Sequence, residues 1–122
     1  VALAIETDNQ ANAYVTGYFT GPMTINDSVY YPVGWDIFVV KINETGEITA
    51  MAHPECEGSE IGYGITITPG NQVVLTGWFQ NQIAFDDGTR LTSFGGSDIL
   101  IAAFNSDLEF RWAKNPGTEG VE

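Results

Sequence analysis

Cysteine, histidine and basic residues are all scarce in this sequence. A single cysteine, Cys56, excludes an internal disulfide framework. Only 4 lysine and arginine residues accompany 16 acidic ones, and the resulting formal charge of −12 would repel the phosphates of a nucleic acid. The longest uninterrupted apolar run, Ile99–Phe104, is far shorter than the about 20 residues of a membrane span. The sequence therefore argues against nucleic-acid binding and membrane insertion.

The apolar content is nevertheless sufficient for a folded core. Hydrophobic residues make up 43% of the 122 positions and aromatic residues 12%. A chain of this length and composition is one domain, or part of one, and is not expected to be disordered.

An internal repeat is the strongest signal in the sequence. The segment Tyr14–Phe19 matches Val74–Phe79, and Gly34–Val39 matches Gly96–Ile101. The first pair is offset by 60 positions and the second by 62, so the second copy carries two extra residues. A repeat of this period is typical of arrays built by stacking one supersecondary unit on the next.

The repeat divides the chain into two units, residues 1–60 and 61–122. Both units begin and end at the same phase of the repeat, and the chain opens on Val1 without a methionine or a signal segment. We therefore expect the chain to be a fragment of a longer tandem array, or the ordered part of one.

Each unit is predicted to consist of strands, because β-branched and aromatic residues alternate between clusters of Gly, Asn, Asp and Pro. No stretch has the spacing of an amphipathic helix, so essentially no helix is expected. The Asp86–Gly88 turn predicts a small extra hairpin, Gln82–Phe85 with Arg90–Ser93. The main predicted strands are Leu3–Thr7, Asn12–Thr20, Asp36–Ile42 and Glu47–Ala52 in the first unit, and Gly64–Thr68, Gln72–Phe79, Asp98–Phe104 and Glu109–Lys114 in the second.

The predicted fold class is all-β, with two tandem four-stranded antiparallel β-propeller blades that form a partial propeller. Tyr14, Thr16 and Tyr18 should face one way while Val15 and Phe19 face the other. A sheet with two apolar faces must be covered on both sides, which stacked copies achieve. Propellers have typically 4 to 8 blades, so the expected partners are further blades of the same chain or other copies of it.

The second unit resembles the SBBP repeat, a seven-bladed β-propeller repeat of bacterial extracellular proteins. The first unit is similar through Tyr14–Phe19 and Trp35–Ile42 but departs from the pattern at Trp35 and at Ala50–Met51. The resemblance implies a secreted or cell-surface location in a bacterium. The segments that carry it are Val73–Phe79, Ile83–Phe85, Leu91–Ser93, Gly95–Ile99 and Arg111–Lys114.

The polar residues predict no catalytic, cofactor-binding or metal-ligating set. His53 is expected in a surface loop, and with Cys56 it makes too few ligands for zinc. Asp36 and Asp98 recur at the start of the third strand, where we expect them to cap backbone N–H groups in the turn after glycine. The acidic charge leaves weak calcium binding at the surface open.

The aromatic residues divide into two sets. Tyr18, Trp78 and Trp112 are expected to fill the space between blades. The second set comprises the predicted ligand-binding residues, Tyr30, Tyr31 and Trp35.

Three hypotheses on function follow. The first is a non-enzymatic secreted or cell-surface repeat module that acts as a scaffold, adhesion or binding unit with a protein or glycan ligand. The second is a carbohydrate-binding module that contacts sugars through Tyr30, Tyr31 and Trp35. The third is a fragment of a secreted hydrolase whose catalytic carboxylates lie on other blades.

Overall fold

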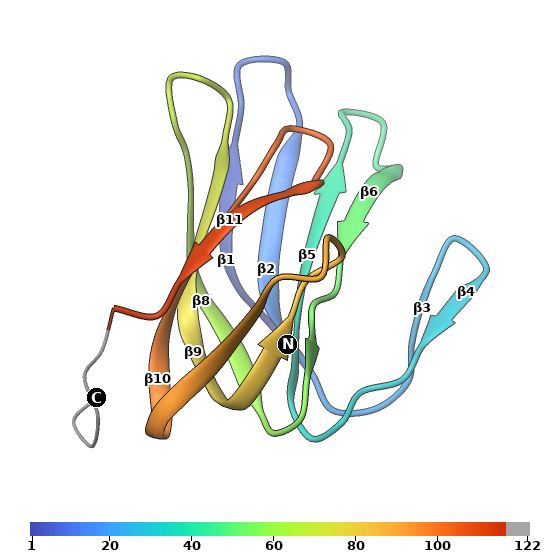
Figure 1. Cartoon of the computed structure of the whole chain (residues 1–122). Helices are drawn as coiled ribbons and strands as arrows, with labels where there is room; N and C mark the ends of the chain where they lie inside the picture. The colour runs from blue at the N-terminus through green and yellow to red at the C-terminus, as the bar shows by residue number, and fades with distance from the viewer. Residues whose placement is uncertain (117–122) are drawn as a thin grey trace.

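The computed structural model describes residues 1–116, which form antiparallel β-sheets and contain no helix (Figure 1). The all-β prediction is therefore confirmed for this range. Residues 117–122, the end of the predicted second unit, lie outside it. The first sheet has the order β1-β2-β5-β6 and consists of β1 (Ala2–Thr7), β2 (Ala13–Phe19), β5 (Asp36–Ile42) and β6 (Ile48–Ala52). The second contains β8 (Glu60–Ile67), β9 (Val73–Ala84), β10 (Arg90–Phe104) and β11 (Phe110–Lys114).

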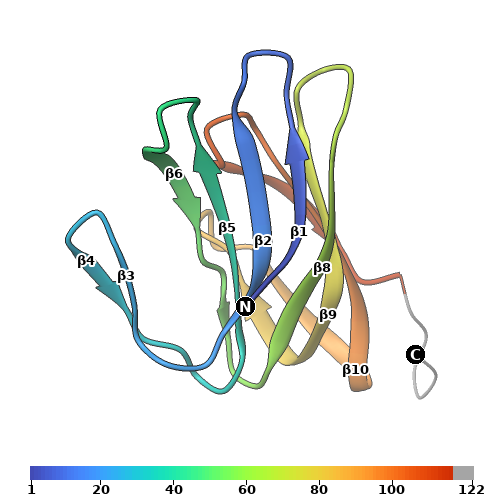
Figure 2. The same ribbon diagram turned by 180° about the vertical axis from the view of Figure 1, so that it is seen from behind.

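Each sheet follows the chain order of its unit, and the two are built alike. Residues 1–116 form no closed barrel or propeller, so the assignment of the sheets as blades remains a proposal. A short hairpin, β3 (Met23–Ile25) with β4 (Ser28–Tyr30), stands beside the first sheet (Figure 2).

The second unit carries the same hairpin as a continuation of its central strands. Ala84 pairs with Arg90 and Gln82 with Thr92. The predicted hairpin is therefore present, formed by the C-terminal end of β9 and the N-terminal end of β10. A two-residue strand that was not predicted, β7 (Glu55–Cys56), pairs with this extension of β9. The first unit thereby reaches over to the second sheet.

A repeated glycine fits a bulge in the neighbouring strand. The pairing of β8 with β9 shifts register between Gly62 and Gly64, opposite Gly77. A Cβ atom on Gly77 would overlap the carbonyl oxygen of Ile61. Gly17 has the same relation to the carbonyl oxygen of Val1. The repeat therefore retains glycine where the edge strand approaches the backbone most closely.

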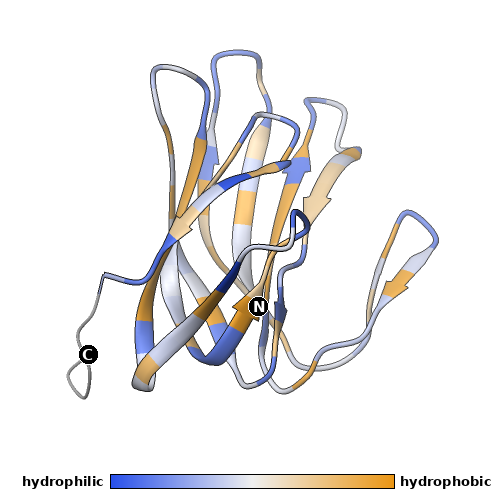
Figure 3. Cartoon of the chain, in the orientation of Figure 1, coloured by the Kyte–Doolittle hydropathy of each residue, from blue (hydrophilic) through white to orange (hydrophobic). Residues whose placement is uncertain are grey.

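The main core lies between the two sheets, in a contact that we call the seam. Strand β8 packs against β1, β2 and β5. Hydrophobic residues are concentrated in the strands on either side of the seam, and hydrophilic residues at the turns (Figure 3). The fully buried side chains of the seam include Tyr14, Ile37 and Val39 from the first sheet and Val73, Leu75, Phe79, Ile83, Leu100, Ala102 and Phe104 from the second.

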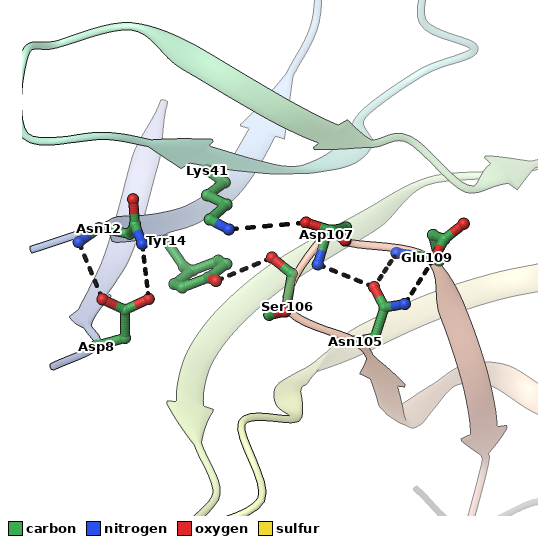
Figure 4. A network of polar contacts seen from close by, with 8 residues as sticks. All are labelled: Asp8, Asn12, Tyr14, Lys41, Asn105, Ser106, Asp107 and Glu109. Carbon is green, nitrogen blue, oxygen red and sulfur yellow. Dashed lines mark hydrogen bonds and ion pairs between the residues drawn. The ribbon is translucent and has the colours of Figure 1, made fainter. Parts of the chain in front are cut away.

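Polar contacts hold one end of the seam (Figure 4). The hydroxyl of Tyr14 donates to the carbonyl oxygen of Ser106 at 3.0 Å, and the Lys41 ammonium lies 3.9 Å from the Asp107 carboxylate. Asn105 shapes the turn that presents both partners, because its Oδ1 accepts the backbone N–H groups of Asp107 and Glu109. The turn of the second unit is therefore fixed against the first sheet.

Candidate functional site

A cavity of about 430 Å³ is the candidate functional site. Asp36, the first residue of β5, lines it, whereas Lys41 lies near the other end of the same strand, so the cavity and the contact of Lys41 with Asp107 are at opposite ends of β5. Both units contribute to the cavity: the loop that precedes β5, the segment around β7, and the hairpin extension of β9 and β10. Its lining residues are Tyr31, Val33, Asp36, His53, Glu55, Cys56, Glu57, Gln82, Ala84 and Arg90.

A buried acid–histidine pair forms one wall of the cavity. The Nε2 atom of His53 lies 3.0 Å from Oδ2 of Asp36, and both side chains are largely buried. The imidazole ring packs edge-on against Phe19, at 5.0 Å between ring centroids, and against Tyr30 at 6.0 Å. The prediction of a surface histidine is therefore wrong. The buried carboxylate of Asp36 requires a hydrogen-bonding partner, and the imidazole of His53 provides it.

The second unit has an aspartate at the same position, but its partner is an asparagine and not a histidine. Asp98 occupies the position of Asp36, and Asn115 that of His53, each pair 17 residues apart. Oδ2 of Asp98 accepts from the backbone N–H of Phe94 at 2.7 Å and from Nδ2 of Asn115 at 3.3 Å. The predicted capping role is confirmed for Asp98, although Phe94 precedes the glycine pair. Asp36 instead bonds to a histidine, so only the first unit places an ionisable partner here.

Glu60 joins the two sheets beside this pair. Its backbone N–H donates to the Trp35 carbonyl oxygen at 2.6 Å, and its Oε1 accepts the backbone N–H of Ile37 at 3.1 Å. Burial, and then the negative charge of Asp36, raise the pKa of Glu60 to about 8, against the lowering effect of the Ile37 N–H. Glu60 is therefore largely a neutral acid at pH 7.

Sequence reasoning did not single out Glu60. The available signal was its recurrence at Glu122, the same position of the second unit. An acid repeated at a unit boundary indicates a contact that every junction between units needs. The position of Glu122 itself lies outside the described residues.

Cys56 lies next to Glu60 as a buried thiol. Its Sγ donates to the Gln80 carbonyl oxygen at 3.2 Å. Burial, followed by the nearby Glu60 carboxyl, raises the pKa of the thiol to about 12. A thiol with this pKa is not a nucleophile at neutral pH. Among residues 1–116, no group of three or more His, Cys, Asp or Glu side chains is arranged to hold a metal ion.

The three predicted ligand-binding aromatics do not share one surface. Tyr31 lies at the cavity and is 70% exposed. Trp35 stacks on Tyr18 at 5.0 Å between ring centroids, and Tyr30 packs against the outer side of the first sheet. Only Tyr31 therefore lines the cavity.

The aromatics that were expected between blades have different environments. Tyr18 is partly covered by Trp35. Trp78 and Trp112 lie on the side of the second sheet that faces away from the seam, and Trp112 is 38% exposed. The expectation that they are core residues is not met within residues 1–116, because no second sheet covers that side.

Comparison with known proteins gives no family assignment. No family model matches the chain, and no curated protein matches it. The resemblance to the SBBP repeat therefore stays a prediction. The described residues contain no helix long and apolar enough to cross a membrane.

Proposed function

We propose that the chain is a non-enzymatic repeat module, with its two sheets as successive blades of an SBBP-like β-propeller array that serves as a scaffold or binding unit. A secreted or cell-surface location in a bacterium is part of this proposal and derives from the family resemblance. The inert thiol of Cys56 and the internal pairing of Asp36 with His53 are consistent with a structural role.

The observation that carries the proposal is that unlike faces of the two units meet at the seam. Ile37 and Leu100 are both fully buried there. The counterpart of Ile37 in the second unit, however, is Ile99, whose side chain points to the opposite side of the sheet from Leu100. Contacts between unlike faces can be repeated indefinitely by adding units, as a ring of blades requires.

The natural gene product tests this proposal through its sequence, mass and assembly state. We expect either further units of about 60 residues in the same polypeptide or a closed oligomer of two-unit chains. A natural protein that consists of these two units alone and is monomeric would contradict the proposal. So would turnover of polysaccharide, ester or peptide substrates by this chain.

The cavity supports carbohydrate binding as a second candidate function. Tyr31 offers an exposed ring at its rim, and Gln82 and Arg90 place an amide and a guanidinium in its wall. Arg90 donates to Gln82 at 2.9 Å, which fixes both groups. An aromatic ring beside fixed polar groups suits the apolar faces and hydroxyls of a sugar.

A glycan array with the full chain tests this second function. If a glycan binds, Tyr31→Ala should reduce the affinity about tenfold or more, since it removes the exposed ring. Val29→Ala, a change on the β3–β4 hairpin outside the cavity lining, should leave the affinity unchanged. Absence of any bound glycan, or equal loss in both variants, would count against sugar binding at this cavity.

The hydrolase hypothesis stays a prediction. Asp36 lines the cavity, but Glu60, the other buried acid close to it, does not. Three carboxyl groups line the cavity, those of Asp36, Glu55 and Glu57, but only Asp36 is buried and it is already bonded to His53.

A further inference from the structure

Equivalent residues of the two units differ sharply in exposure. Ile37 is completely buried in the seam, whereas its counterpart Ile99 is 48% exposed. On the other face of the repeat unit, the residue of the second unit is the covered one. Ile65 packs against the seam core, whereas its counterpart Ile5 in the first unit is 64% exposed. Each unit thus lacks the neighbour that the other unit has.

The second sheet therefore has an open face, which repeats the side that the first sheet buries. The face carries a hollow of about 270 Å³ lined by Trp78, Ser97, Asp98 and Ile99. In the first unit Trp35 stands at the position of Ser97 and stacks on Tyr18, the counterpart of Trp78. The open face consists of Val74, Thr76, Trp78, Ile99, Ile101 and Trp112.

The first sheet has the complementary surface on its other side. There Phe38 and Val40 occupy the positions that Leu100 and Ala102 fill at the seam. We call this the first outer face; it consists of Ile5, Val15, Phe38, Val40, Ile42 and Met51. Phe38 and Val40 form a buried cluster with Ile25 of the β3–β4 hairpin, so the hairpin is part of this face, as the hairpin extension of the second unit is part of the seam core. Ile5 on the same face remains 64% exposed.

We propose that the open face of one chain docks onto the first outer face of a second copy of this chain, in the same way as the two units meet at the seam. This inference rests on the proposed function and names its partner. The argument is continuity with an existing interface, because most positions of the new contact have counterparts that lie in the seam core or pack against it. Apolar surface on both faces supplies the driving force.

This contact is head-to-tail, so each chain offers one open face and one first outer face. Association therefore does not stop at a symmetric dimer; it continues until a ring closes or a filament grows. A symmetric pairing of two open faces would instead leave both first outer faces without a partner chain.

Sedimentation velocity of the full chain and two variants tests the inference. We expect the sedimentation coefficient of the unmodified chain to rise with protein concentration, with a dissociation constant below about 1 mM. Ile99→Asp on the open face and Ile5→Asp on the first outer face should each weaken association about tenfold or more, because each places a charge in an apolar contact. Both positions are well exposed within the chain, so both variants should fold.

Mixing the two variants gives the decisive result. Each retains the face that the other has lost, so an equimolar mixture should form a one-to-one dimer that neither variant forms alone. Tyr63→Asp is the matched control: Tyr63 is 55% exposed, and its counterpart Leu3 stays 41% exposed even though the first unit has its neighbour, so this variant should associate like the unmodified chain. An unmodified chain that remains monomeric up to about 1 mM overturns the inference. So does Ile5→Asp dimerising alone, which would indicate a symmetric contact.

Failure here is separable from failure of the proposed function. A natural protein with further units in one polypeptide would still support the repeat module even if separate two-unit chains did not associate. Conversely, association of the chains does not depend on the presence of additional units in the gene product.

Discussion

Replacing Gly77 with alanine is expected to destabilise the chain by about 3 kcal/mol or more, at the upper end of what overpacking a folded chain costs. The added Cβ would overlap the carbonyl oxygen of Ile61 and lie 3.0 Å from its carbonyl carbon and 3.1 Å from Cα of Gly62. All three atoms belong to the backbone of β8, which cannot move without breaking its pairing with β9. Urea-induced unfolding, followed by tryptophan fluorescence, measures the change.

Gly96→Ala is the matched control for this prediction. Gly96 lies in the same strand pair, and a Cβ atom placed there meets nothing within 4 Å. Its stability should stay within about 0.5 kcal/mol of the unmodified chain. If Gly77→Ala were equally mild, the bulge in β8 would not explain why glycine recurs at this position.

Glu60→Gln is expected to remove most of a pH dependence of stability. The pKa of Glu60 is about 8 in the folded chain and 4.5 in its ordinary state, so between these values the folded chain keeps a proton that the unfolded chain has released. Stability is therefore greatest below pH 4.5 with respect to this group, and falls as the pH rises to about 8. The slope is at most about 1.4 kcal/mol per pH unit, or roughly 3–5 kcal/mol in all.

Glutamine cannot ionise and retains an oxygen for the N–H of Ile37, so the slope of stability between pH 5 and 8 should flatten. Unfolding in urea at several pH values measures it. The exposed Glu57, which lies three residues away, provides the control variant Glu57→Gln, for which the slope should be unchanged. A slope that persists in Glu60→Gln would assign the pH dependence to another group.

The repeat predicted most of the fold because backbone geometry is local and recurs. The alternation of side chains along Tyr14–Phe19 placed Tyr14 and Thr16 at the seam and Phe19 on the opposite face, as the structure has them. The turn at Asp86–Gly88 correctly located the second hairpin. Periodicity of apolar residues and turn chemistry were sufficient for these elements.

The candidate site could not be predicted in the same way, because it depends on which chain segments meet in space. His53 lies in a segment without regular structure, and only the buried carboxylate of Asp36, 17 residues earlier, explains its position. Glu60 becomes a neutral acid only because the two sheets close over it. Trp78 and Trp112 are the large aromatic residues expected in a core, but their burial depends on a neighbouring sheet that residues 1–116 do not supply.

The contact between unlike faces also bears on how such a protein changes length during evolution. Ile37 and Ile65 lie on opposite faces of equivalent units, and each face fits the other kind of face on the next unit. A duplicated gene segment therefore adds one surface of each kind. Duplication or deletion of a whole unit therefore leaves every remaining junction intact, and selection can alter copy number without redesigning the core.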